Sequence, residues 1–591
     1  MMENEFQRRI QYLLDEYPVW TRRTVAEHFD LAAEKYRARI FLSTPGSQYT
    51  YAQIHQQVEL FARGLLALGI RPREHVALII GNCAELIIAK LALAKIGAVT
   101  VALNTMLLER EISFLLDDSD AVAVIFNDSL GKQDFIKIMR NIFPDAFNGS
   151  PKDHSFRCPR FPKMRHLIYF SPSGKQYPGL VDLPSLFRLA GQVPASELKK
   201  IQAANAYPDN VYDLMYTSGT TALPKGVLLS HDMCLRNVFS FCVHRSIENG
   251  RRFYSPLPFY HIFAWNYLIM VATFTGGALV THAQFNPTEA LELIEKFQAN
   301  EIVCVPSILL VLVNHPDLKK YDLSSLRSVF CAASPAPLPL WKRAVEDLKL
   351  SEIGTGYGLT EACGAITLTV PGESIEKVTN RVGQIMVPNN SGLPEFKGCN
   401  FQCKVINMET QEELAAGQEG ELLCRGNTVT RGYYKRPEVN AELIDKDGWL
   451  NTGDLVVIHP DGCFQFTGRS KEIYKTSAEN VMPKEIEDII GTHPKVNQVY
   501  VVGVPHEIMG ETGVAFVELK PGEKATRREI INFCKDKLAK FKIPRYVFFV
   551  SAQELSFATT GKIQKYKLVE YAQKLIRDSK IGDGKEGSTA L

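Results

Sequence analysis

Apolar residues along the first part of the chain follow two alternating spacings. The three- and four-residue intervals of amphipathic helices occur in the segments 23–33, 54–68, 85–95 and 109–116. Short apolar runs typical of buried strands lie between them, at 76–80, 98–103 and 121–126. Helices that alternate with buried strands predict a parallel sheet with helices on its faces, so the predicted fold class is α/β.

The same alternation returns later in the chain. Helices are expected at 289–297 and 307–313, and strands at 302–305 and 326–333. Between the two α/β stretches, residues 141–194 are rich in Pro, Gly, Ser and basic side chains. This composition predicts a long irregular excursion over the surface.

The pattern changes near residue 400 to short strands with close turns, at 402–406, 420–425 and 463–467. It predicts a β-rich subdomain. A compact α+β unit is expected beyond residue 469, with helices at 483–490 and 527–538 and strands at 499–504, 514–519 and 546–550. Residues 579–591 are small and polar, and we expect them to form a disordered tail.

The length, net charge and cysteine content of the chain bear on the number of domains and on which classes of function are expected. A chain of 591 residues exceeds what one core usually supports, so at least two domains are expected. Its 67 basic and 65 acidic residues leave a net charge of only +2, which gives no electrostatic reason to expect nucleic acid. The 12 cysteines lack the regular spacing of a disulfide framework or a zinc site, as is usual in a reducing compartment.

One uncharged stretch, 262–280, is nearly long enough to cross a bilayer. Gly276 and Gly277 divide it, so we expect a buried helix followed by a strand. The N-terminus has no apolar secretory region and the C-terminus no peroxisomal tripeptide. Cytoplasmic residence is therefore expected, with peripheral contact at a membrane left open.

The candidate chemistry begins in the stretch Tyr216-Thr-Ser-Gly-Thr-Thr-Ala-Leu-Pro-Lys225-Gly-Val227, between two apolar runs. Hydroxyl side chains and glycines around one lysine suit an anion approached from several directions. It is not a Walker A loop, because Pro224 and Gly226 stand where that pattern needs Gly and Ser or Thr. The alternative is an ordinary surface turn rich in Ser, Thr and Gly.

This stretch resembles the phosphate-binding signature of the adenylate-forming superfamily, which includes acyl-CoA synthetases, luciferases and the adenylation domains of peptide synthetases. Ala222 stands where the signature usually has glycine. The resemblance implies that ATP is bound by Thr217, Ser218, Gly219, Thr220, Thr221 and Lys225, with Thr221 also near the metal. A second loop, Ser334-Pro335-Ala336, follows a predicted strand and is expected in the same crevice, because ligands of such sheets gather where strands end.

A second signature is Gly354-Thr-Gly-Tyr-Gly-Leu-Thr-Glu361. Its glycine spacing does not fit a dinucleotide fingerprint. The resemblance implies that the Tyr357 ring lies against the adenine, that Gly356 and Gly358 belong to the same ATP site, that Thr360 contacts phosphate and that Glu361 holds Mg²⁺. A cation bound mainly by phosphates needs only one or two protein carboxylates, although a turn that starts a helix is the alternative.

Two further signatures occur later in the chain. Asp454 follows a turn glycine, where an aspartate is often a turn residue but can accept hydrogen bonds from two ribose hydroxyls. The resemblance implies the ribose role, a ribose and phosphate contact for Arg469, and a hinge at Lys471.

The last signature, 560–565, contains Lys562. By composition alone this lysine would be a solvated surface residue. The resemblance implies instead that it is catalytic and stabilises negative charge as a carboxylate attacks the α-phosphate.

The segment Pro256-Leu-Pro-Phe-Tyr-His-Ile-Phe-Ala-Trp265 resembles the lining of the acyl site in the same superfamily, with His261 near the reacting carboxylate. Phe259, Ile262 and Trp265 suit an alkyl chain, although ordinary core packing is the alternative for each. The segment has no acidic residue to pair with a substrate ammonium, so the substrate is expected to lack an amine. The amino-acid sequence of this segment is similar to that of long-chain fatty acyl-CoA synthetases.

The resemblance implies ATP-dependent activation of a carboxylic acid, expected to be a medium- or long-chain fatty acid, to acyl-AMP and then to an acyl-CoA thioester. ATP, Mg²⁺ and CoA are the expected cofactors and co-substrates, and the expected partners are small molecules, with the oligomeric state left open. It also implies a large N-terminal domain of parallel α/β subdomains and a β-rich subdomain (1–467), a hinge (468–471) and a small mobile α+β lid (472–578).

Three alternatives remain. An acyl-AMP ligase would deliver to a carrier protein or other acceptor, although the short interval from Asp454 to Arg469 leaves no room for the insertion such ligases tend to carry. A luciferase-like oxygenase shares the signatures. A non-catalytic acyl- or nucleotide-binding protein is disfavoured by the presence of both Glu361 and Lys562.

Overall fold

The computed structural model describes residues 2–147, 155–217, 224–476, 479–506, 509–535, 537–551, 554–555 and 563–578. The chain forms two compact units. The first comprises Met1–Gln402 and Cys424–Leu450, and the second comprises Cys403–Leu423 and Asn451–Leu591. The hinge predicted at 468–471 lies inside the second unit, and the predicted domain boundaries stay predictions.

One seven-stranded sheet of the first unit has the order β11-β10-β4-β3-β5-β8-β9. Its strands are β3 (His75–Ile79), β4 (Val99–Ala102), β5 (Ala121–Asn127), β8 (His166–Phe170), β9 (Val181–Asp182), β10 (Val211–Thr217) and β11 (Lys225–Ser230). Only β11 pairs antiparallel with its neighbour. The central strands β3, β4 and β5 are mostly apolar, as expected where helices cover both faces of a parallel sheet.

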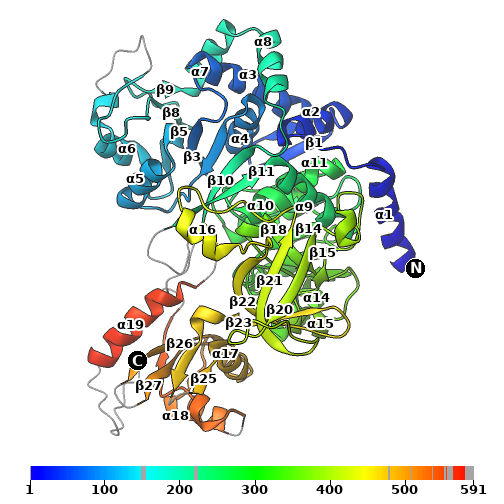
Figure 1. Cartoon of the computed structure of the whole chain (residues 1–591), viewed down its shortest axis with the longest axis vertical. Helices are drawn as coiled ribbons and strands as arrows, with labels where there is room; N and C mark the ends of the chain where they lie inside the picture. The colour runs from blue at the N-terminus through cyan, green and yellow to red at the C-terminus, as the bar shows by residue number, and fades with distance from the viewer. Residues whose placement is uncertain are drawn as a thin grey trace. The chain divides into compact units, whose positions relative to one another are not determined.

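Helices of the first half surround this sheet: α2 (Val25–Lys35), α3 (Tyr51–Ala67), α4 (Ala84–Ile96), α5 (Glu109–Asp118), α6 (Phe135–Ile142), α7 (Leu183–Leu189) and α8 (Ala195–Ala204). Figure 1 shows α5 and α6 together beside β5 and β8. Ile112 and Leu116 of α5 and Met139 of α6 join the strand residues in one buried core.

The second seven-stranded sheet has the order β16-β15-β14-β12-β13-β1-β2. Its strands are β1 (Ile40–Ser43), β2 (Gln48–Thr50), β12 (Arg252–Tyr254), β13 (Ala278–Val280), β14 (Glu301–Cys304), β15 (Ser328–Cys331) and β16 (Glu352–Gly354). Helices α12 (Pro287–Phe297), α13 (Pro306–Val313) and α14 (Leu338–Leu348) pack on it through Leu291, Leu309 and Trp341.

The stretch 262–280 forms a buried helical segment and a strand, as predicted. Its parts are α10 (Ile262–Ala264), a π-helix (Trp265–Met270), α11 (Val271–Thr275) and β13. Gly276 ends the helical part at a φ of 59°, where an added side chain would also meet the ring of Tyr36. Among the described residues, no helix combines the length and apolar composition needed to cross a bilayer.

The structure corrects the prediction for residues 141–194, whose positions 148–154 lie outside the described residues. Instead of an irregular excursion, the segment contributes the buried strand β8, the edge strand β9 and helix α7. Five consecutive residues from His166 pair with β5. The run is apolar, but its basic and proline-rich surroundings concealed it.

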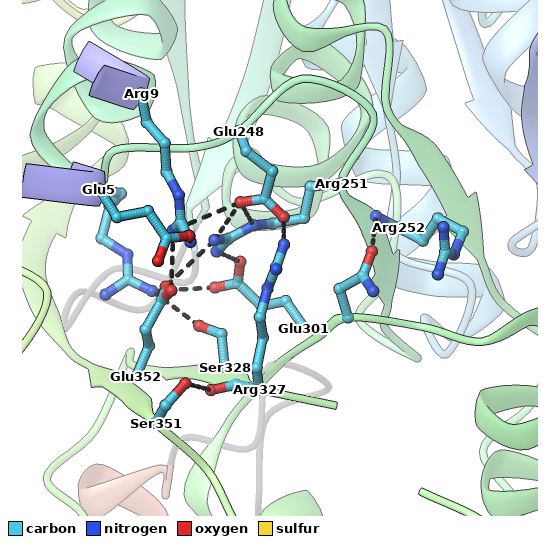
Figure 2. Close-up of polar contacts among 12 residues, drawn as sticks. Glu5, Arg9, Glu248, Arg251, Arg252, Glu301, Arg327, Ser328, Ser351 and Glu352 are labelled. Carbon is cyan, nitrogen blue, oxygen red and sulfur yellow. Dashed lines mark hydrogen bonds and ion pairs between the residues drawn. The ribbon is translucent and has the colours of Figure 1, made fainter. Parts of the chain in front are cut away.

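Charged side chains are gathered at the amino ends of the second sheet's strands (Figure 2). Arg251, just before β12, pairs with Glu301 of β14 at 2.6 Å and with Glu352 of β16 at 3.1 Å. Arg9 of α1 (Met2–Glu16) reaches the same Glu352 at 2.8 Å. Burial alone would raise the pKa of Glu352, but the charges of Arg251 and Arg9 lower it instead.

Two further sheets lie in the second unit, apart from end residues of β20, β21 and β22 that belong to the first. A four-stranded sheet consists of β20 (Phe401–Ile406), β21 (Glu419–Gly426), β22 (Leu450–Ile458) and β23 (Phe464–Arg469), which is the predicted β-rich subdomain. A five-stranded sheet contains β24 (Tyr474–Thr476), β25 (Glu479–Val481), β26 (Val496–His506), β27 (Gly510–Leu519) and β28 (Tyr546–Phe549). Helices α17 (Pro483–Gly491), α18 (Arg527–Lys535) and α19 (Lys565–Asp578) pack on the latter.

Candidate functional site

The phosphate-binding signature lies at the turn end of the β10–β11 hairpin. Thr217, the last residue of β10, is in register with Lys225, the first of β11, and its hydroxyl lies 3.4 Å from the Lys225 carbonyl oxygen, to which it donates. The next residue is Gly226, and a larger side chain is disfavoured there because an added Cβ would lie 2.8 Å from Leu214 Cδ1. The hairpin therefore holds both ends of the predicted phosphate loop in place.

The second signature turns back on itself directly after β16. β17 (Gly356–Leu359) pairs antiparallel with β18 (Gly364–Leu368), and the short 3₁₀ turn Thr360–Ala362 joins them. A Cβ on Gly358 would lie 2.0 Å from the Gly364 carbonyl oxygen, so only glycine allows the two strands to approach this closely. The turn leaves the side chains of Thr360 and Glu361 half-buried.

A segment that the sequence reading did not single out joins the two signatures. Residues 430–434 lie beside β11, with Leu228 N donating to Gly432 O at 3.1 Å and Tyr434 N donating to Gly226 O at 2.8 Å. Thr430 N donates to the Glu361 carbonyl oxygen at 2.7 Å. The segment thus ties the phosphate hairpin to the turn that carries Glu361.

Tyr433 lies at the centre of this junction and is 8% exposed. Its hydroxyl donates to Glu361 Oε1 at 2.7 Å, and the Lys225 ammonium lies 5.3 Å from its ring centroid. Burial and the negative charge of Glu361 raise the pKa of Tyr433, so it stays a neutral donor. No periodicity or spacing marks this tyrosine, because its partners are far away in the sequence.

Glu361 fits the implied Mg²⁺ as a single protein carboxylate. In the part of the chain that the structure describes, no three His, Cys, Asp or Glu side chains are grouped to hold a metal. A hard cation held mainly by phosphate oxygens needs no such group, and Lys225, which lies over the Tyr433 ring, suits those phosphates. The Ser334-Pro335-Ala336 loop follows β15 at the same sheet edge as Gly354, because Phe330 is in register with that glycine.

The predicted acyl segment is held by a second residue that sequence reasoning did not single out. Asn82, after β3, donates from Nδ2 to Leu257 O at 2.8 Å and accepts from Phe259 N at 2.9 Å. His261 caps α10 by accepting from Phe263 N at 3.2 Å. The sequence could have drawn attention to Asn82 as a polar residue directly after an apolar strand. The Gly81-Asn82 turn alone, however, did not show that Asn82 contacts the acyl segment.

The three apolar residues predicted for the acyl pocket are packed in the interior. Phe259, Ile262 and Trp265 are between 0 and 4% exposed, whereas His261 is half-buried. Trp265 begins the π-helix, and the Lys90 ammonium lies 4.0 Å from its ring centroid. π-Helical turns often occur at functional sites, but the pocket role of these side chains stays a prediction.

In the second unit, Asp454 lies on β22 in register with Arg469 of β23. Arg469 Nε and Asp454 Oδ1 are 2.9 Å apart. Lys471 follows in a 3₁₀ turn. Both residues predicted to contact ribose are therefore neighbours on one sheet, with the predicted hinge directly after them.

Residues 29–434 match the family described as AMP-binding enzyme, and residues 485–562 match the AMP-binding enzyme C-terminal domain. The chain belongs to the AMP-binding enzyme family. It is 34% identical over 549 residues to YngI of Bacillus subtilis (strain 168), which is assigned by name to the acyl-CoA synthetases, covering 93% of this chain and 96% of that protein. It is 31% identical over 558 residues to the mitochondrial medium-chain acyl-CoA ligase ACSF2 of Danio rerio, covering 93% and 88%.

A solved structure has the same fold. The anthranilate CoA ligase AuaEII in complex with anthranoyl-AMP superposes with a TM-score of 0.79 at 24% identity, covering 95% of this chain and 99% of that one. The predicted α/β fold class and the predicted superfamily are confirmed. AMP-binding enzymes use ATP, Mg²⁺ and CoA, so the expected cofactors are confirmed at the level of the family.

Several residues predicted for this AMP-binding enzyme lie outside the described residues. They are Ser218, Gly219, Thr220 and Thr221 of the phosphate loop and Lys562 of the last signature. Lys565, three positions later, is described: its ammonium pairs with Glu472 at 2.8 Å and with Glu487 at 2.9 Å. The roles of the individual site residues stay predictions.

Proposed function

We propose that this enzyme activates a medium- or long-chain fatty acid with ATP and transfers the acyl group to CoA. The observation that supports the proposal is that Lys225 and Glu361, the residues proposed to bind phosphate and metal, both contact Tyr433. The relatives named acyl-CoA synthetase and medium-chain acyl-CoA ligase support the same assignment.

The proposed first step is attack of the substrate carboxylate oxygen on the α-phosphorus of ATP. A bond forms between that oxygen and the phosphorus, and pyrophosphate leaves. Lys225 neutralises phosphate oxygens and Lys562 stabilises the charge that develops at the α-phosphate; Glu361 would hold Mg²⁺, which would supply further positive charge to the phosphates. Holding both reactants in one site removes much of the entropic barrier to their reaction.

In the proposed second step the CoA thiolate attacks the acyl carbonyl carbon, a thioester forms, and AMP leaves. Asp454 and Arg469 hold the ribose, and Lys471 is the hinge about which the small domain turns between the steps. His261 lies beside the reacting carboxylate, and Phe259, Ile262 and Trp265 surround the start of the alkyl chain. The absence of an acidic residue from 256 to 265 supports a substrate without an amine.

A screen of pyrophosphate release across short, medium, long and aromatic acids, with and without CoA, tests this proposal. We expect the highest kcat/KM with medium or long alkyl acids and a thioester product only when CoA is present. Each methylene that enters an apolar pocket is worth about 0.8 kcal/mol, so a gain of roughly fourfold per added methylene is expected until the pocket is full.

Two outcomes would contradict parts of the proposal. Acid-dependent pyrophosphate release with no thioester formed from CoA would favour an acyl-AMP ligase with another acceptor. No acid-dependent release with any acid would instead favour a binding protein.

A further inference from the structure

We propose that Tyr433 restricts Glu361 to one metal-coordinating oxygen and thereby sets the preference of the site for Mg²⁺ over Ca²⁺. The inference rests on the proposed function, in which Glu361 is a metal ligand. Tyr433 is then a positioning residue that acts through Glu361.

The contact itself is specific. The Tyr433 hydroxyl donates to Glu361 Oε1 at 2.7 Å, which is a short hydrogen bond to a charged acceptor. With Oε1 engaged, Oε2 is the oxygen left for a cation. In the described part of the chain, Glu361 forms no ion pair with a lysine or arginine, since the nearby Lys225 ammonium lies over the Tyr433 ring instead.

The position of the Tyr433 hydroxyl is set by elements other than Glu361. Tyr433 N donates to Asn440 Oδ1 at 2.7 Å, and Asn440 Nδ2 donates back to Tyr433 O at 2.9 Å. Asn440 belongs to helix α16 (Pro437–Leu443). The preceding Gly432 has a φ of 120° and packs against Asn440, where an added Cβ would lie 2.6 Å from Asn440 Cγ. The backbone of Tyr433 is therefore anchored on both sides.

The turn that carries Glu361 is anchored as well, by buried groups away from Tyr433. Asn237 of α9 (His231–His244) donates from Nδ2 to Ala365 O at 2.9 Å. The Tyr267 hydroxyl donates to Asn237 Oδ1 at 2.6 Å, and it also accepts from the Ala365 amide. Donor and acceptor are thus each held by contacts that do not involve the Tyr433 hydroxyl, so the hydrogen bond between them is preorganised.

This arrangement discriminates between cations by geometry. Mg²⁺ requires six ligands in a nearly regular octahedron and takes one oxygen from a carboxylate, whereas the larger Ca²⁺ accepts six to eight and often takes both. A carboxylate whose second oxygen is occupied by a hydroxyl suits the first geometry. Release of that oxygen removes the restriction and allows the bidentate mode that Ca²⁺ favours.

The adjacent tyrosine supplies a matched control. The Tyr434 hydroxyl also donates to a carboxylate oxygen, Asp120 Oδ2, at 2.9 Å. Asp120 is paired with Lys163 and Lys435 and has no contact with the Glu361 turn among the described residues. Tyr434→Phe therefore removes the same chemical group from the same segment without changing the environment of Glu361.

The experiment measures equilibrium binding of ATP by calorimetry at varied Mg²⁺ or Ca²⁺, with acid and CoA omitted so that no turnover occurs. We expect Tyr433→Phe to weaken Mg²⁺-dependent binding roughly tenfold, as is typical when a hydrogen bond to a metal ligand is lost, while Ca²⁺-dependent binding is unchanged or tighter. The ratio of Mg²⁺ to Ca²⁺ affinity should fall by about the same factor, and Tyr434→Phe should leave it at the wild-type value.

An unchanged ratio in Tyr433→Phe, or an equal fall in both variants, would overturn the inference. Thermal unfolding checks the fold of each variant, and Tyr433→Met, which also removes the hydroxyl, replaces Tyr433→Phe if the latter does not fold. Glu361→Gln separates the two proposals. If its binding of ATP keeps the wild-type metal dependence, the metal role of Glu361 itself is wrong; if that dependence is lost while Tyr433→Phe keeps the wild-type ratio, only the role of Tyr433 is wrong.

Discussion

Three histidines of the first unit are buried as neutral side chains. Burial lowers the pKa of His28 and His231 to about 3 and that of His244 to about 4, from 6.5 in an exposed histidine. His231 Nδ1 accepts from Val25 N at 3.1 Å, which requires the neutral ring. Their charge state therefore differs between the folded and the unfolded chain in mildly acidic solution.

This difference predicts that acid weakens the fold well before the carboxylates titrate. Below pH 6.5 the unfolded chain binds protons at these histidines and the folded chain does not, so the free energy of unfolding falls as the pH is lowered toward 4. Each histidine contributes a slope of up to about 1.4 kcal/mol per pH unit. Urea denaturation at pH 7, 6 and 5 measures the free energy of unfolding of the first unit. In His28→Phe, the slope of this free energy against pH should be smaller than in the wild type by the contribution of one histidine. A slope equal to that of the wild type would show that His28 is not buried as a neutral ring.

Helix α1 is joined to the rest of the first unit by a charged residue. Its Arg9 side chain is 9% exposed and pairs with Glu352, the first residue of the strand that leads into the Gly354–Glu361 signature. Glu352 also pairs with Arg251, so loss of Arg9 leaves the buried carboxylate with one cation. Helix α1 therefore stabilises the amino end of β16 through the ion pair of Arg9 with Glu352.

We expect Arg9→Met to lower the free energy of unfolding of the first unit by about 1–3 kcal/mol, the usual cost of removing a hydrogen-bond donor from a charged group. The neighbouring Arg8 is exposed on the same helix, and Arg8→Met should change stability by less than about 0.5 kcal/mol. Chemical denaturation followed by circular dichroism measures both. Equal stability of the two variants would mean that the Arg9 contact contributes nothing.

At the scale of the whole molecule, the alternating pattern predicted β3, β4 and β5 of the first sheet and β13, β14 and β15 of the second, because these strands are short apolar runs near amphipathic helices. It missed β8 and β9 of the first sheet and β1, β2 and β12 of the second. It did not predict α1, which carries the buried Arg9, nor the buried Lys90, which pairs with Asp213 of β10 at 2.6 Å. Apolar periodicity cannot indicate a buried charge whose partner is distant in sequence. Tyr433 was missed for the same reason, since it meets β11 and Glu361 only through long-range strand pairing.

The candidate site was predicted because its signatures resemble those of the adenylate-forming superfamily, and amino-acid composition alone indicated it only weakly. Thr217 and Lys225 are paired in the β10–β11 hairpin, Lys225 and Glu361 both contact Tyr433, and Asp454 and Arg469 are neighbours in the second unit. The contact between the β10–β11 hairpin and the Glu361 turn, made through residues 430–434, could be seen only in the structure. The connection to Asn82 also needed it, because a buried amide shows no pattern along the chain.

Under the proposed function, the protein forms an acyl adenylate from a fatty acid and ATP. The most direct measurement is fatty-acid-dependent exchange of labelled pyrophosphate into ATP without CoA, compared with thioester formation from supplied acyl-AMP and CoA. We predict exchange in the wild type, its loss by at least about a hundredfold in Lys562→Ala as a charge-stabilising group is removed, and largely unchanged thioester formation in that variant. Absence of acid-dependent exchange in the wild type, or equal loss of both reactions in Lys562→Ala, would contradict the account.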